Sequence, residues 1–200
     1  MLLKGFALNG DRVNFKLSDC PVYFTNNIIG LVGIKGSKLI SASTIMRGDE
    51  ETGVFEGDRV YLKGELIGYV VYAGGFKLQT LNDELKNLFD DPHIKVKEGN
   101  RKTANIVSNS EYRSELVFRY NKKNIYMSVF LFKNKDGMLA VAGKSLNGTL
   151  IDPEQIHFYT GLADDDGTKL FFDELYKGGI LSLRNGMPCI VKSESEIIYL

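Results

Sequence analysis

The chain has 200 residues, with 25 basic and 25 acidic side chains and a formal net charge of zero. This balance weighs against a strongly nucleic-acid-binding protein, although a local basic patch stays possible. No apolar stretch approaches the roughly 18 residues that a membrane span needs, and the apolar run at the start is too short for a signal peptide. Cys20 and Cys189 lie far apart and form no disulfide framework. We therefore expect a soluble, cytoplasmic protein without a membrane partner.

The first half of the chain has the pattern of a β-meander. Asn9–Gly10 lies between two apolar runs, and this pair favours the type I′ hairpin turn, in which both central residues need a positive φ. Further short runs rich in β-branched and aromatic residues follow, separated by turn residues. The predicted strands cover residues 5–8, 12–17, 22–24, 28–34, 38–43, 59–62, 66–73 and 76–80.

One segment departs from this strand pattern. Residues 80–90 read TLNDELKNLFD, in which four apolar residues recur at helical spacing behind a capping residue, and Pro92 follows. The sequence therefore predicts a helix here, whose apolar stripe covers the open end of a barrel.

After Pro92 the strand pattern resumes. The predicted strands of this half cover residues 94–98, 103–110, 114–120, 124–132 and 138–143. Strands at regular short intervals are typical of barrels and sandwiches. We expect an all-β fold built from two β-meander or SH3-like barrel halves, residues 1–91 and 92–200, with one helix between them.

Two segments repeat one pattern. Residues 45–60 read IMRGDEETGVFEGDRV, and residues 159–176 read YTGLADDDGTKLFFDELY. Each has an acidic, glycine-bearing turn, then an aliphatic–aromatic pair, then a carboxylate and a return to apolar residues. Such self-similarity indicates a repeat, with one copy in each half of the chain.

This pattern resembles the motif of the YopX-like family of phage and prophage proteins. VFEGDRV (54–60) matches the core of the motif, GELIGYVVYAGGF (64–76) matches the family's hairpin, and YTGLADDDGTKLFF (159–172) matches the front half. The chain departs from the family at 172–174, where Phe-Asp-Glu replaces Glu-Gly-Asp, and at 46–48, where Met-Arg-Gly replaces Thr-Gly-Leu. The resemblance implies a mainly β fold, a mobile-element origin, an enlarged or duplicated relative, and no assigned biochemical activity.

The repeated motif also has a physical interpretation of its own. Gly57 permits a backbone conformation that other residues resist, and Asp58 can accept backbone N–H bonds across the turn. The acidic run at Asp164 is interpreted as a solvated turn, with weak cation binding as the alternative. We expect the motif residues to be structural, with catalysis or ligand contact as the alternative; they are Phe55, Glu56, Gly57, Asp58, Gly161, Asp164, Gly167 and Phe171.

The sequence carries no catalytic or metal-binding signature. His93 and His157 are its two histidines, and neither lies near a nucleophile motif such as G-x-S-x-G. A structural zinc needs about four Cys or His ligands, and Gly143–Lys144–Ser145 lacks the spacing of a phosphate-binding loop. We expect no enzyme activity, no metal and no cofactor.

Basic residues gather in two stretches, with tyrosines interleaved in the second. Aromatic rings beside cations hold single-stranded nucleic acid or a nucleotide, but the same residues also suit the solvent face and the edges of a sheet. The possible binding patch consists of Lys95, Lys97, Arg101, Lys102, Tyr112, Arg113, Arg119, Tyr120, Lys122, Lys123 and Tyr126.

The leading hypothesis for function is a non-enzymatic phage protein that binds a host macromolecule, most readily a protein, and inhibits antiviral defence. Two alternatives are a nucleic-acid-binding β-barrel and a protein that sequesters a nucleotide signal. Because meander halves expose edge strands, we also expect a homodimer or higher oligomer, with residues 124–132 contributing to the contact.

Overall fold

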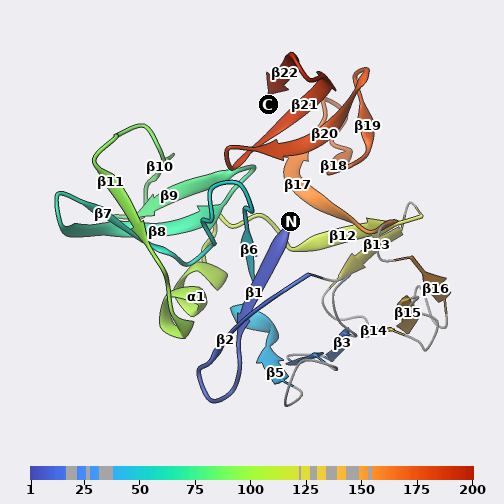
Figure 1. Ribbon diagram of the computed structural model, residues 1–200, viewed down its shortest axis with the longest axis horizontal. Coiled ribbons are helices and arrows are strands. Elements are labelled where there is room, and N and C mark those ends of the chain that lie inside the picture. Colours follow the sequence, from blue (N-terminus) through green and yellow to red (C-terminus); the bar gives the residue numbers. More distant parts are fainter. Residues whose placement is uncertain are drawn as a thin grey trace.

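The computed structural model describes residues 1–16, 22–25, 28–31, 38–121, 123–126, 130–133, 139–142, 149–152 and 155–200. Antiparallel strands dominate this part of the chain, which contains one α-helix, α1 (Arg101–Ser108), and one 3-10 helix, η1 (Ala42–Thr44) (Figure 1). The all-β prediction is confirmed. The predicted barrels are not seen, because every sheet of the described ranges is open, with two edge strands.

No helix in the described ranges is long and apolar enough to cross a membrane.

Residues 2–87 form what we call the first unit. Its strand β1 pairs with β2 and β6, β3 to β5 form one meander, and β7 to β10 form another. The strands are β1 (Leu2–Phe6), β2 (Arg12–Phe15), β3 (Val22–Thr25), β4 (Ile28–Leu31), β5 (Lys38–Ser41), β6 (Met46–Gly48), β7 (Arg59–Leu62), β8 (Glu65–Tyr72), β9 (Phe76–Thr80) and β10 (Leu85–Asn87).

Residues 117–199 form the second unit, and it has the same order of pairing. Strand β12 pairs with β13 and β17, β14 to β16 form one meander, and β19 to β22 form another. The strands are β12 (Val117–Tyr120), β13 (Lys123–Tyr126), β14 (Phe130–Lys133), β15 (Leu139–Ala142), β16 (Thr149–Ile151), β17 (His157–Ala163), β18 (Lys169–Phe171), β19 (Leu175–Tyr176), β20 (Gly179–Arg184), β21 (Met187–Ser193) and β22 (Glu196–Tyr199).

A connector, residues 94–116, joins the two units. Its strand β11 (Ile94–Lys97) pairs with β7 and extends the sheet of the first unit to five strands. Helix α1 then packs against η1 and β8. In Figure 1 the helix lies beside the first unit and away from the β19–β22 sheet. Helix α1 therefore covers the first unit, while Glu115 at the end of the connector pairs with Lys169 of the second unit.

The two units also agree in the detail of their turns. The β7–β8 turn has Lys63 and Gly64 at φ of 51° and 91°, and the β19–β20 turn has Lys177 and Gly178 at φ of 45° and 82°. Both central residues of a type I′ turn need such positive φ values. The same residue pair in the same conformation at the same place indicates that the two units are copies of one fold.

The corner that precedes each meander repeats as well. The amide of Gly57 donates to the carbonyl of Val70, and the amide of Asp173 donates to the carbonyl of Leu181. Gly57 has a φ of 78° and Asp173 a φ of 64°. An aspartate thus adopts the left-handed conformation that glycine adopts in the first unit, which aspartate tolerates better than most residues do.

The hydrophobic core is shared between the units. One cluster of buried residues gathers Val54, Val60, Val70, Tyr72, Phe76 and Leu78 from the first unit and Leu88, which directly follows it, with Phe172 from the second. Phe172 directly follows the aliphatic–aromatic pair Leu170–Phe171 of the second repeat. The repeated motif therefore supplies a core residue where the two units meet.

The predicted helix over residues 80–90 is wrong. Residues 85–87 form strand β10, in which Leu85 pairs with Gln79. Asp83, at a φ of 61°, turns the chain back on β9. Leu88 is buried in the shared core, but Leu81, Leu85 and Phe89 are exposed, so the four apolar residues do not form one buried face. Sheet pairing therefore overrides the helical spacing.

The helix lies instead where residues 103–110 were predicted to form a strand. Asn100 begins α1 with a capping box, because its side chain accepts from the Thr103 amide and Thr103 accepts from the Asn100 amide. Threonine replaces the usual glutamate or glutamine of this motif. The β-branched residues Ile106 and Val107 gave the segment the composition of a strand.

Other predictions are confirmed in part or fall outside the described residues. Strands β1 and β2 form the predicted hairpin, but of Asn9 and Gly10 only Gly10 has a positive φ, so the turn is not type I′. The Gly10 amide donates to the Ala7 carbonyl, and residues 8–10 form a three-residue loop. Cys20, Lys122, residues 127–129 and residues 143–148 lie outside the described ranges.

We predict that Gly57→Ala destabilises the protein more than Gly53→Ala does. Both glycines have a positive φ, which costs alanine about 1–2 kcal/mol. A Cβ at Gly53 meets nothing within 4 Å, whereas one at Gly57 lies 3.1 Å from the Cα of Ala104 in α1. Crowding adds about 1–3 kcal/mol at Gly57. Urea unfolding measures both costs, and equal costs would contradict the packing of α1 on the corner.

Candidate functional site

A cation, an aromatic ring and a carboxylate meet at the corner of the first unit. Lys4 Nζ lies 2.7 Å from Asp58 Oδ1 and 4.9 Å from the ring centroid of Phe55. Burial lowers the pKa of Lys4, and the charge of Asp58 partly offsets this. Asp58 also accepts the backbone N–H bonds of Phe55 and Gly99. The predicted acceptance of N–H bonds across the turn is therefore confirmed.

The second unit builds the same arrangement from different residues. Arg119 Nη1 lies 3.1 Å from Glu174 Oε2, and the Arg119 guanidinium lies 3.9 Å from the ring centroid of Phe171. The registers agree, because Lys4 pairs with Met46 as Arg119 pairs with His157. Repetition of an internal ion pair in both copies indicates that it holds the corner.

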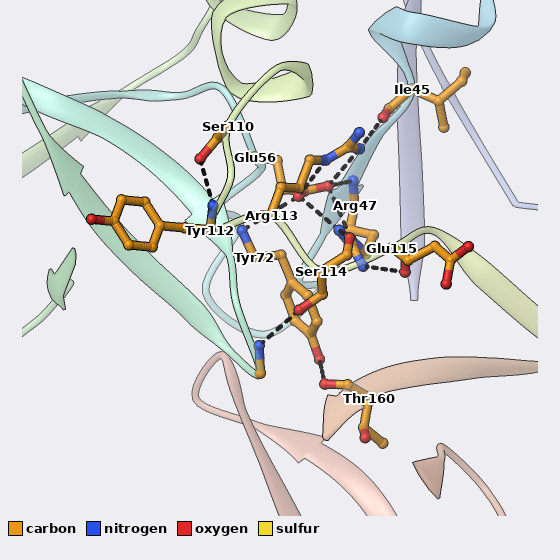
Figure 2. Close-up of polar contacts among 11 residues, drawn as sticks. Ile45, Arg47, Glu56, Tyr72, Ser110, Tyr112, Arg113, Ser114, Glu115 and Thr160 are labelled. Atoms are coloured by element: carbon orange, nitrogen blue, oxygen red, sulfur yellow. Dashed lines mark hydrogen bonds and ion pairs between the residues drawn. The ribbon is translucent and has the colours of Figure 1, made fainter. Parts of the chain in front are cut away.

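Glu56 is the centre of a larger buried cluster in the first unit (Figure 2). Arg47 Nε and Nη2 donate to its two carboxylate oxygens, both at 3.0 Å. Arg113 Nε and Nη2 donate to the same two oxygens at 3.0 and 3.2 Å. The amides of Arg47 and Tyr72 also donate to it. A fully buried carboxylate is thus surrounded by donors.

This cluster ties the first unit to the connector and to the second unit (Figure 2). Arg47 also donates to the carbonyl oxygens of Ser114 and Glu115 in the connector. The Tyr72 ring lies 4.5 Å below the Arg47 guanidinium, and its hydroxyl donates to the Thr160 carbonyl of β17 at 2.7 Å. One carboxylate therefore organises contacts among all three parts of the chain.

The pKa shifts in the cluster favour a structural role over a catalytic one. Burial acts to raise the pKa of Glu56, but Arg113 and Arg47 outweigh it and lower the pKa from 4.5 to about 2. Burial raises the pKa of Tyr72. Neither group exchanges a proton near neutral pH, and general acid–base catalysis needs one that does.

The second unit has aromatic residues where the first has this ion pair. The amide of Glu56 donates to the Arg47 carbonyl, and in the second unit the amide of Phe172 donates to the Phe158 carbonyl. Phe172 is buried and packs against Phe158 in the shared core. A buried ion pair and an apolar pair are near equals in stability when each is complete. The unit folds with either.

Of the remaining motif residues, Gly161 lies where the register of β17 shifts, and Asp164 and Gly167 lie in the turn that follows β17. Gly161 has a φ of 83°, and a Cβ there would lie 2.7 Å from the Gly74 amide. Asp164 accepts the amides of Asp166 and Thr168, and Gly167 has a φ of 85°. No group of three or more potential metal ligands occurs in the described part of the chain.

The predicted binding patch is not one surface. Arg113 and Arg119 are used in the internal ion pairs above, Arg101 donates to the Leu8 carbonyl, and the Tyr112 hydroxyl donates to the Asp83 carbonyl. Lys122 lies outside the described residues, and only the backbone of Lys123 and Tyr126 is described. Of the rest, Lys95 and Lys97 lie on one face of β11, with both side chains exposed.

The structure shows one surface that sequence reasoning missed and one that keeps Lys95 and Lys97 of the predicted patch and adds Lys63. One is an apolar row across the β19–β22 sheet, and the other is a basic hollow between β7 and β11. The alternation of apolar and polar residues along 59–62 and 94–97 predicts two strands. The sequence does not show that these strands pair with each other, which is what forms the hollow. The apolar row forms only when β19 to β22 pair in the observed order and register, and the sequence alone does not give that pairing.

No known protein family, curated protein or solved structure matches the chain. The resemblance to the YopX-like family therefore stays a prediction.

Glu56→Gln should destabilise the protein by about 3–5 kcal/mol, because it leaves the buried Arg47 and the mostly buried Arg113 without their counter-charge. The folded-state pKa of Glu56 is below its unfolded value, so the carboxylate stabilises the fold above pH 4.5 and loses this effect as the pH falls toward 2. The variant should lack this component of acid sensitivity. Urea unfolding between pH 2 and pH 7 measures it; identical pH profiles would contradict the cluster's role.

Proposed function

We propose that this chain is a non-enzymatic, phage-encoded protein that binds a host protein and thereby inhibits host antiviral defence. The resemblance of its two motifs to the YopX-like family supports the phage origin. The saturated, ionised state of the buried Glu56 supports a binding role over catalysis. The binding surface that we assign is the apolar row of the second unit.

The apolar row, Leu175, Ile180, Val191 and Ile197, is the observation that carries this proposal. Each strand of the β19–β22 sheet contributes one residue, and the register places them directly opposite one another. Leu175 is 75% exposed, Ile180 43% and Ile197 39%. The opposite face holds the buried Leu181 and Ile190. Contiguous exposed apolar residues mark interaction sites.

In the first unit, helix α1 covers part of the equivalent face. The equivalent row of the first unit is Arg59, Tyr69, Gln79 and Leu85. There Tyr69 packs with Val71 against Ala104 and Val107 of helix α1. Because the connector occurs once, the described residues offer no such helix to the second unit.

The partner that fits is therefore a protein with a short amphipathic helix. In the first unit such a helix needs only a narrow apolar stripe, with Thr103, Ala104 and Val107 buried. In the second unit aliphatic side chains replace Arg59 and Gln79, so a partner helix with larger apolar residues would be favoured. Helices dock in this way on apolar surfaces of many binding proteins.

We predict that the double substitution Leu175→Asp with Ile180→Asp abolishes binding of the host protein. Central apolar contacts dominate interface energies, so the affinity should fall at least about tenfold. Leu81→Asp is the control, because Leu81 is 57% exposed but lies in the first unit. The partner is identified by affinity purification during phage challenge, and its purified form is then titrated against each variant.

Three outcomes would overturn the proposal. One is the lack of a stoichiometric host partner, and another is equal loss of binding in the Leu81→Asp control. The third is a dimer of the free protein in light scattering that the double substitution dissociates, because a second copy would then occupy the row.

A further inference from the structure

A hollow of about 460 Å³ lies beside the β7–β11 strand pair of the first unit. Antiparallel register places Lys95 opposite Tyr61 and Lys97 opposite Arg59. Because alternate residues of a strand face the same side, all four side chains lie on one face of the sheet. The lining of the hollow is Tyr61, Lys63, Gly64, Pro92, His93, Lys95 and Lys97.

The charge of this basic hollow is of one sign. Three lysines and a histidine line it, and no carboxylate does. Within the described ranges Lys63, Lys95 and Lys97 have no carboxylate within 4.0 Å. Ten other basic side chains in those ranges, Lys4, Arg12 and Lys192 among them, each form an ion pair. In a chain of zero net charge, such a gathering of unpaired cations is a local excess.

The strand register makes this excess costly. Lys97 and Arg59 are directly opposite on neighbouring strands, and like charges in this position destabilise a sheet. Arg59 donates to the Glu98 carbonyl, and Lys97 Nζ lies 4.8 Å from the ring centroid of Tyr61. The ring therefore holds one ammonium at the hollow. An anion bound here would relieve the repulsion.

We propose that the basic hollow binds a chain of phosphates. Lys95 and Lys97 are two residues apart on one strand, which separates their Cα atoms by about 6.7 Å. Lys63 adds a third ammonium from the neighbouring turn. Lysine binds phosphate as a point charge, so three ammonium groups suit several linked phosphates better than a single carboxylate. A nucleoside polyphosphate and a single-stranded nucleic-acid backbone share this chemistry.

This site is independent of the apolar row, because it lies in the first unit and uses charge. The second unit supplies an internal control. Its Lys177–Gly178 turn repeats the Lys63–Gly64 turn, with the same signs of φ. No described strand pairs with β19 as β11 pairs with β7, so the second turn lacks the other two lysines.

The test is titration of the full chain with three probes: inorganic tripolyphosphate, ATP and a fluorescent oligothymidylate of about 12 nucleotides. At about 50 mM salt we expect saturable binding of tripolyphosphate. Lys95→Gln with Lys97→Gln should weaken it at least about tenfold and lower the salt slope by about 2. Lys63→Gln should weaken it less, and Lys177→Gln should leave it unchanged.

The probes also separate the two sources of the phosphates. Competition between tripolyphosphate and the oligonucleotide would assign the site to nucleic acid, and binding of ATP without the oligonucleotide would assign it to a nucleotide. No saturable binding of any probe would overturn the inference, as would equal weakening by Lys177→Gln. Circular dichroism confirms that each variant is folded.

Discussion

The buried carboxylate of Glu56 is the constraint on which the arrangement of this protein depends. A buried charge is unfavourable unless it is paired and hydrogen-bonded, and Glu56 finds its partners in Arg47 of the first unit and Arg113 of the connector. Those arginines in turn donate to the backbone carbonyl oxygens of Ser114 in the connector and of Ile45, which lies between η1 and β6. The chain can satisfy the carboxylate only when the connector lies against the first unit, which fixes where α1 docks.

Duplication followed by divergence explains the rest of the architecture. Both units keep the cation, ring and carboxylate of the corner, as Lys4 with Asp58 and Arg119 with Glu174. They differ where the first unit has Arg47 and Glu56, because the second has aromatic residues there. The connector follows the charged version and leaves the outer face of the second sheet uncovered. Because the connector packs on the first unit, β11 completes the basic hollow there. In the described part of the chain the second unit lacks such a cover, which leaves its apolar row exposed.

Much of this fold follows from local sequence signals, and the exceptions have physical causes. The repeated motif, its positive-φ glycine and the acceptor role of Asp58 were predictable, because each depends on residues close in sequence. The helix was misplaced, since the spacing of Leu81 to Phe89 describes a segment that pairs with β9 instead. Arg113 was assigned to a surface patch because its partner Glu56 lies 57 residues away. No local pattern announces a pair so distant.

The claim that Glu56 couples the two units is tested most directly by native-state hydrogen exchange at two equivalent amides. The Val70 amide donates to the Asp58 carbonyl, and the Leu181 amide donates to the Glu174 carbonyl. Coupled units open together, so both amides should exchange with the same free energy of opening, equal to that of global unfolding. Exchange of Leu181 through an opening of lower free energy that leaves Val70 protected would contradict the account.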